Sequence, residues 1–201
     1  MKLIAISQRL EKSNYGENRA QLDTRLFDFV IKSGLMPIPI PYFNGNKNFF
    51  INNLNKWLKK TKPSGLIISG GEDVGKNKIR DESEIFLIKY FKKKKLPILG
   101  ICRGMQLIAL LNGSKLIRVK NHVNKSIIIY TGKTRTKVKC YHNYTLKNCP
   151  KGFNVVSISR DEKIECIKSK KHKILCIMWH PEREKKFNLY NINIFQNFFK
   201  K

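Results

Sequence analysis

The chain has 201 residues, of which 41% are hydrophobic and 10% aromatic, a composition that excludes a disordered chain and suits one packed domain. No apolar run is long enough to cross a bilayer, and the five cysteines lack the CxxC spacing of common zinc sites. Lysine and arginine number 41 against 14 aspartates and glutamates, and this gives a formal net charge of +27.

This charge would attract nucleic acids, acidic membranes or small anions. The positive residues are spread along the whole chain, and no helix-turn-helix or RNA-recognition signature accompanies them. We therefore favour a lysine-rich solvated surface, with an anionic small substrate next and nucleic-acid binding supported by charge alone. The opening MKLIAISQRLEK is more typical of a β-strand than of a signal peptide, so we expect a cytoplasmic protein that does not bind membranes.

Strands and helices alternate through the first half of the chain. The apolar patterns predict strands at 3–7, 36–40, 65–69 and 96–101, and helices at 21–34, 48–60 and 82–92. Such alternation is typical of βαβ units, and therefore of a mainly parallel sheet with helices on both faces. We expect the nearly continuous apolar strand at 96–101 to be buried on both faces.

The second half of the chain is predicted to contain mainly strands. Strand patterns at 116–119, 126–131, 136–140, 155–160 and 174–178 follow one another without long helices, and a last helix is predicted at 188–199. No linker or internal repeat is visible. We expect a single α/β domain over residues 1–201, whose second half carries a β-rich addition.

A cysteine between two glycines lies where the strand at 96–101 meets a short helix at 105–111. Cys102 could be a small buried hydrophobe at this junction. The alternative is a nucleophile on a sharp strand-to-helix turn, where Gly100 and Gly104 allow close backbone approach. The amino terminus of the helix would lower the pKa of the thiol and offer N–H groups to an oxyanion.

Two further segments favour the nucleophile. The strand at 174–178 leads into His180, Pro181 and Glu182, and a thiol nucleophile needs a base that a carboxylate orients. The strand at 65–69 ends in Gly70 and Gly71, which could be an ordinary turn or could direct a backbone N–H at a substrate carbonyl. No metal or organic cofactor is needed for this chemistry, and none is expected.

Together these segments resemble the class I glutamine amidotransferases and the related γ-glutamyl hydrolases, over nearly the whole chain. The matching stretches are GICRGMQ, LIISGGEDV and WHPE, with IRDESE, KCYHNY and SRDEKIECI resembling segments of the hydrolase branch. The resemblance implies that Cys102 is the nucleophile, His180 the base and later acid, and Glu182 the residue that orients it. The fold it implies is the flavodoxin-like amidotransferase fold.

The resemblance also implies roles for residues around the triad. The backbone N–H groups of Gly71 and Arg103 would form the oxyanion hole. Substrate contacts would come from Gly70, from Gln106 and from the segment that holds Tyr141 and His142. Lys139, Cys140 and Asn143 depart from the family's Asn, Ser and second His, which leaves details of the substrate contact open.

The amino-terminal stretch ISQRLEKSNYGENRAQLDTRLFDF resembles small γ-glutamyl hydrolases found with bacterial surface-polysaccharide genes. That resemblance implies hydrolysis of γ-glutamyl-CDP-amidate to glutamate and cytidine diphosphoramidate, for the O-methyl phosphoramidate of capsule. Arg9 and Arg19 could pair with the diphosphate, or merely with acidic neighbours such as Glu11 and Glu17. The alternatives are a glutaminase subunit that passes ammonia to a separate synthetase partner and a hydrolase of γ-glutamyl-amines.

Overall fold

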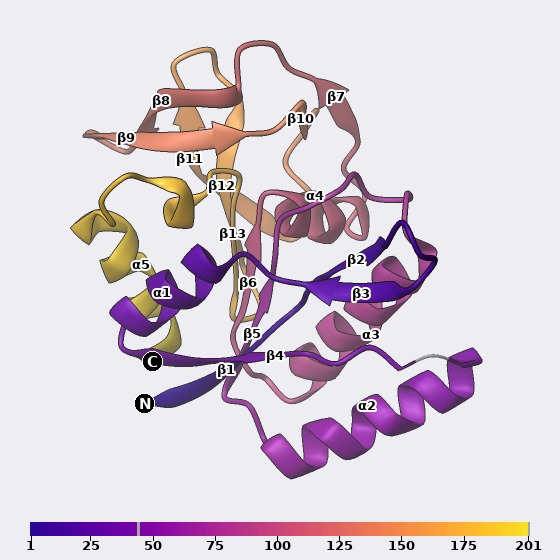
Figure 1. The fold of residues 1–201 in the computed structure, drawn as a ribbon. Coiled ribbons are helices and arrows are strands. Elements are labelled where there is room, and N and C mark those ends of the chain that lie inside the picture. Colours follow the sequence, from indigo (N-terminus) through magenta and orange to yellow (C-terminus); the bar gives the residue numbers. More distant parts are fainter. Residues whose placement is uncertain (44, 201) are drawn as a thin grey trace.

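A mixed sheet of nine strands runs through the molecule in the order β4–β1–β5–β6–β13–β12–β11–β8–β9 (Figure 1). The computed structural model describes residues 1–43 and 45–200. The strands of this sheet are β1 (Lys2–Ile6), β4 (Leu35–Pro39), β5 (Gly65–Ile68), β6 (Ile98–Ile101), β8 (Val123–Thr131), β9 (Thr134–Tyr141), β11 (Phe153–Ser159), β12 (Ile164–Ser169) and β13 (Ile174–Ile177).

The sheet changes character at β13. From β4 to β13 every neighbouring pair is parallel, whereas β12, β11, β8 and β9 continue the same sheet with antiparallel pairs. The residues of β5 and β6 are all buried, as expected for parallel strands covered on both faces. Most strands of the β-rich second half therefore extend the central sheet.

Helices cover both faces of the parallel part, and they pack on alternate residues of each strand. Ala5 and Leu66 point toward α2, α3 and α4, while Ile4 and Ile67 point toward α1 and α5. Figure 1 shows α1 and α5 together on one side of the strands. The helices are α1 (Thr24–Lys32), α2 (Lys47–Thr61), α3 (Lys78–Lys93), α4 (Arg103–Leu110) and α5 (Leu189–Lys200). The predicted α/β class, with a largely parallel sheet between two layers of helices, is confirmed.

Two small sheets and a short helix complete the chain. The strands β2 (Arg9–Lys12) and β3 (Asn18–Gln21) form an antiparallel hairpin, and β7 (Leu116–Arg118) pairs with β10 (Tyr144–Leu146). A 3₁₀ helix, η1, covers Pro181–Arg183. The hairpin lies in the segment between β1 and α1, where no strand was predicted, and it follows the carboxyl end of β1.

Some boundaries differ from the prediction. The helix predicted at 82–92 begins earlier, at Lys78, because the side chain of Asn77 accepts a hydrogen bond from the N–H of Arg80 and caps the helix. This places Arg80, Asp81 and Glu84 on the first turns of α3. The strand β12 was not predicted at all.

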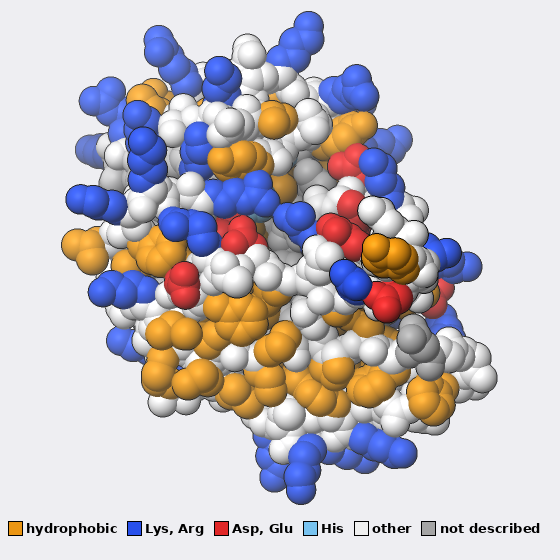
Figure 2. Space-filling view, viewed as in Figure 1, with side chains coloured by type: hydrophobic (Ala, Val, Ile, Leu, Met, Phe, Trp, Pro, Cys, Tyr) orange, Lys and Arg blue, Asp and Glu red, His pale blue; other side chains and the backbone are white. Residues whose placement is uncertain are grey.

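Positive side chains are distributed over the surface of the molecule. Figure 2 shows lysines and arginines along much of the outline of one face, with acidic side chains near a hollow at its centre. Among the residues that the structure describes, no helix has both the length and the apolar character that a membrane span requires.

Candidate active site

Cys102 occupies a strained turn between β6 and α4. Its backbone has φ of 50° and ψ of −103°, a conformation that residues with a side chain rarely adopt. A Cβ atom built on Gly100 would lie 2.9 Å from the carbonyl carbon of Gly104, and one built on Gly104 would collide with the carbonyl oxygen of Ile68. Glycine is therefore required on both sides, and the turn presents the thiol at the carboxyl end of the sheet.

His180 is brought to this thiol by the pairing of β13 with β6. Ile177 lies opposite Ile101 in the parallel register, so the two strands end side by side. The N–H of Cys102 donates to the carbonyl of Ile177 at 2.7 Å, and the side chains of Cys102 and His180 line the same cavity. The register of the sheet thus brings the sulfur and the imidazole to one edge of the sheet.

Glu182 orients the histidine from η1. His180 Nδ1 lies 2.6 Å from Glu182 Oε1, and both side chains are buried. Burial alone would lower the pKa of His180, but the Glu182 carboxylate and the Cys102 sulfur outweigh it and raise this pKa to about 9. The imidazolium in turn holds the pKa of Glu182 below its usual range, although burial acts in the opposite direction. The buried pair therefore favours a protonated histidine beside the sulfur.

The glycine pair after β5 faces the same sulfur and imidazole. A Cβ atom on Gly70 would lie 2.6 Å from His180 Cε1, so no side chain fits at this position. Gly71 has a φ of +147°, which favours glycine, and a Cβ there would collide with Arg80 Nη1. Both glycines are required by close packing around the predicted oxyanion site.

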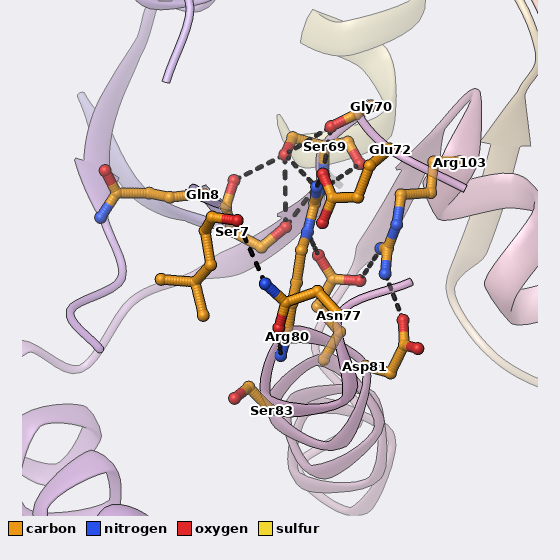
Figure 3. A network of polar contacts seen from close by, with 12 residues as sticks. Ser7, Gln8, Ser69, Gly70, Glu72, Asn77, Arg80, Asp81, Ser83 and Arg103 are labelled. Atoms are coloured by element: carbon orange, nitrogen blue, oxygen red, sulfur yellow. Dashed lines mark hydrogen bonds and ion pairs between the residues drawn. The ribbon is translucent and has the colours of Figure 1, made fainter. Parts of the chain in front are cut away.

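A buried network of ion pairs supports both sides of that site (Figure 3). The guanidinium of Arg80 is fully buried and donates through Nη2 to the carbonyls of Ser69, at 3.1 Å, and Gly70, at 2.9 Å. Its Nε donates to Glu84 Oε1 at 2.9 Å, and its Nη1 donates to Glu72 at 2.6 Å. The glycine segment is therefore held by its carbonyls.

The same carboxylate of Glu84 also holds the turn that carries Cys102. Its second oxygen accepts a hydrogen bond from Arg103 Nη1, while Arg103 Nη2 donates to Asp81. Arg103 follows the nucleophile directly, and its side chain is 1% exposed. The Glu84 carboxylate thus connects, through Arg80, to the carbonyls just before Gly71 and, through Arg103, to the turn that carries Cys102. The N–H groups of Gly71 and Arg103 are the predicted donors to the oxyanion.

A cavity of about 420 Å³ opens onto the sulfur. Its lining residues are Arg9, Leu10, Glu11, Gly71, Glu72, Cys102, Tyr141, His180 and Arg183. The Tyr141 ring meets the His180 ring edge-on, with centroids 5.8 Å apart, and the Arg183 guanidinium lies over Tyr141 at 4.4 Å. The hairpin supplies one wall of the cavity through Arg9 to Glu11, and Tyr141 of β9 with Arg183 of η1 lines another part of it.

The structure separates the predicted substrate contacts into two groups. Arg9 and Tyr141 line the cavity. Arg19, by contrast, is exposed and ion-paired with Glu17 at 2.6 Å, and it does not line the cavity. The reading in which Arg19 pairs with an acidic neighbour is the one that this geometry favours.

Gln106 and His142 are buried beside the cavity and do not line it. Gln106 Nε2 donates to the carbonyl of Tyr144 at 3.0 Å, and His142 Nδ1 lies 3.1 Å from the same oxygen. Their predicted substrate contacts remain predictions. Sequence reasoning missed Arg183 and Glu72, although each lies next to a residue that it did select.

Comparison with known proteins agrees with this geometry. The model of the glutamine amidotransferase class-I family matches residues 42–201, and the chain belongs to that family. It is 30% identical to the Gamma-glutamyl-CDP-amidate hydrolase of Campylobacter jejuni subsp. jejuni serotype O:2, over 98% of this chain and 96% of that protein. The resemblance found in the sequence motifs is therefore confirmed at the level of the family.

One further sequence relative and one solved structure are also similar to this chain. The GMP synthase of Brachyspira hyodysenteriae is 30% identical over 71% of this chain, which corresponds to 28% of that protein. A solved glutamine amidotransferase from Thermotoga maritima superposes with a TM-score of 0.64 and 17% identity, over 90% of this chain and 76% of that one. The latter likeness supports the fold alone.

The His180–Glu182 pair generates a pH-dependent prediction for stability. Because the pKa of His180 is raised to about 9 by folding, its contribution is complete below the unfolded pKa of 6.5 and disappears as the pH rises through 9. Glu182→Gln removes the partner that causes most of this rise. Denaturant unfolding should show wild type losing its advantage over Glu182→Gln, by up to roughly 3 kcal/mol, between about pH 6.5 and 9.5. An advantage that is equal at both pH values would contradict this coupling.

The Glu84 linkage generates a kinetic prediction. Glu84→Gln replaces one buried acceptor oxygen with an NH₂ donor, so an N–H of Arg80 or Arg103 loses its partner. The segments that carry the predicted oxyanion donors should then shift, and kcat should fall by roughly 100-fold with a smaller change in KM. Glu82→Gln is the matched control, because Glu82 lies on the same helix in an exposed pair with Lys47. Steady-state kinetics and unfolding curves should be measured together. A variant that loses stability but keeps its kcat would show that Glu84 serves the fold alone.

Proposed function

We propose that this protein hydrolyses a γ-glutamyl amide through a glutamyl thioester on Cys102. The observation that carries the proposal is that Cys102, His180 and Gly71 line one cavity, while Glu182 Oε1 lies 2.6 Å from His180 Nδ1. Nucleophile, base and orienting carboxylate in this relation are what acyl transfer requires. Membership of the class I amidotransferase family supports the same chemistry.

In the first half-reaction, the Cys102 thiolate attacks the γ-carbonyl carbon and a C–S bond forms. The backbone N–H groups of Gly71 and Arg103 stabilise the resulting oxyanion. The C–N bond then breaks, and His180 gives its proton to the departing nitrogen.

In the second half-reaction, water adds to the thioester. Neutral His180 takes a proton from this water, the C–S bond breaks, and glutamate leaves with restoration of the thiolate. The pair of thiolate and imidazolium needed for the next cycle is regenerated, so no metal or organic cofactor enters any step.

The cavity supplies groups that suit a γ-glutamyl substrate with an anionic leaving group. Glu72 Oε1 is buried without a hydrogen-bond partner, while its other oxygen holds Arg80. It is suited to the α-ammonium of the glutamyl group, because an unpaired buried carboxylate oxygen gains most from a cation. Arg9 and Arg183 line the same cavity and suit carboxylate or phosphate oxygens.

The substrate that fits these groups best is γ-glutamyl-CDP-amidate, with glutamate and cytidine diphosphoramidate as products. The similarity to the Campylobacter jejuni hydrolase over nearly the full length supports this choice, as do the two cavity arginines. The pathway would then be that of the capsule O-methyl phosphoramidate. A cationic γ-glutamyl-amine fits less well, because its leaving group would meet both guanidinium groups.

Similarity to GMP synthase favours a second candidate, a glutaminase that delivers ammonia to a synthetase partner. This candidate differs from the first in substrate and in its need for a partner. Assays of the purified chain separate the two candidates. A freestanding hydrolase is active alone on its own substrate and slow on glutamine, whereas a glutaminase subunit uses glutamine and needs its synthetase partner.

The decisive measurement is glutamate release by the purified protein from γ-glutamyl-CDP-amidate, γ-glutamylputrescine and glutamine. We expect kcat/KM for the first to exceed that for glutamine by roughly 100-fold or more, since glutamine lacks the groups that pair with the cavity arginines. Cys102→Ala should abolish release, whereas Cys149→Ala, at a half-buried thiol away from the cavity, should retain it. Equal rates on glutamine would overturn the substrate assignment.

The two cavity arginines should determine specificity. Arg9→Ala and Arg183→Ala should each raise KM for γ-glutamyl-CDP-amidate about 10-fold, the effect of losing one charge-assisted contact, with little effect on glutamine. Arg19→Ala is the matched control, because this arginine is held by Glu17 outside the cavity. If Arg19→Ala has the larger effect, the hairpin must change position when substrate binds and the assignment of Arg9 is wrong.

A further inference from the structure

A second cluster of reactive side chains lies outside the catalytic cavity. His122, just before β8, Cys140 in β9, His142, just after β9, and Glu165 in β12 are all buried, and one ligand-type atom from each lies within 4.8 Å of the others. None of the four lines the catalytic cavity. Histidine, cysteine and glutamate are the common ligands of zinc in proteins.

The spacing of three of these atoms matches one face of a coordination tetrahedron. His122 Nδ1 lies 3.2 Å from His142 Nε2 and 3.4 Å from Glu165 Oε1, and the remaining separation, from His142 Nε2 to Glu165 Oε1, is 3.6 Å. Bonds of about 2.0–2.2 Å in a tetrahedral zinc site separate the ligand atoms by about 3.3–3.6 Å. The three atoms therefore already stand at metal-binding distances.

The other ring nitrogens are held as they are in metal sites. His142 Nδ1 lies 3.1 Å from the carbonyl of Tyr144, which can only accept, so this nitrogen carries a proton. His122 Nε2 lies 3.1 Å from a carboxylate oxygen of Asp161. Such partners fix the tautomer in which the facing nitrogens, His122 Nδ1 and His142 Nε2, offer lone pairs to a common point.

Glu165 supplies an independent observation. Its side chain is fully buried, and the oxygen that faces both imidazoles has no hydrogen-bond partner. A buried carboxylate oxygen without a partner is costly, and a cation between it and the two nitrogens would remove that cost. Its other oxygen lies 3.9 Å from the sulfur of Cys140.

We propose that His122 Nδ1, His142 Nε2, Glu165 Oε1 and Cys140 Sγ form a closed structural site for a divalent cation of the zinc type. On binding, the Cys140 thiol loses its proton to solvent and the thiolate becomes the fourth ligand. Four protein ligands leave no open position, which is the arrangement of structural zinc sites and not of catalytic ones.

The position of the site gives the metal a role in supporting the active site. Cys140 and His142 flank Tyr141, which lines the catalytic cavity beside His180. The N–H of His180 also donates to the carbonyl of Lys139 at 2.8 Å, so β9 supports the base directly. A cation that ties β8, β9 and β12 together would brace this wall of the cavity. The proposal does not depend on the identity of the substrate.

Cobalt binding tests the site without any measurement of activity. The full-length Cys102→Ala variant, which lacks the competing catalytic thiol, is treated with a chelator under reducing conditions and then titrated with Co²⁺. We expect one equivalent to bind, with the visible bands of tetrahedral cobalt and a sulfur-to-metal charge-transfer band. Zinc should displace the cobalt and raise the melting temperature by mass action.

Substitutions in the same background identify the ligands. Cys140→Ser should remove the charge-transfer band, and Glu165→Gln should weaken binding more than 10-fold. Asp161→Asn, at a half-exposed position, should weaken binding roughly 10–100-fold by removing the carboxylate charge beside His122 Nε2. Asp73→Asn, in a surface pair with Lys76, and His172→Ala, outside the cluster, are matched controls that should bind as the parent does.

The alternative is that no metal binds and that a proton on His122 Nδ1 lies between His122, His142 and Glu165. In that case no stoichiometric binding appears, or the binding that appears is unchanged by Glu165→Gln and Asp161→Asn. Either result would overturn the metal site. Spectra without a charge-transfer band in the Cys102→Ala parent would overturn the assignment of Cys140 as a ligand.

Discussion

Parallel pairing of β5, β6 and β13 is the constraint on which the rest of the structure depends. Parallel neighbours end at the same edge of a sheet, so the segments that follow these strands must meet there. One strand delivers the glycine pair, the next delivers Cys102, and the third delivers His180. A register slip of one residue in β13 would separate the imidazole from the sulfur, because successive side chains point to opposite faces.

Charge inside the protein is arranged very differently from charge on its surface. Figure 2 shows many lysine and arginine side chains along the outline of one face, whereas the interior balances Arg80 and Arg103 with three carboxylates. Buried charges of this kind contribute little net stability, but removal of one partner leaves the others uncompensated. The network therefore constrains geometry more than it adds to the free energy of folding.

The sequence predicted those features that are local in the chain. The apolar strands, the glycines around Cys102 and the triplet from His180 to Glu182 each occupy one short window, and periodicity or residue type reveals them. The hairpin of β2 and β3 escaped prediction because its residues are mostly exposed and show no apolar alternation. The cluster around Glu165 escaped because its members come from three separate segments, with Cys140 and His142 in one of them. The expectation of no metal considered cysteine spacing alone.

The two oxygens of Glu84 have a consequence for how this protein can change over time. Each oxygen is engaged by a different arginine, and each arginine holds a different segment of the predicted oxyanion site. Replacement of any one member strands a buried charge, so a tolerated exchange would have to alter several positions together. We expect Arg80, Glu84 and Arg103 to co-vary among related sequences. The effect of replacing any one of them should depend strongly on which of the others has already changed.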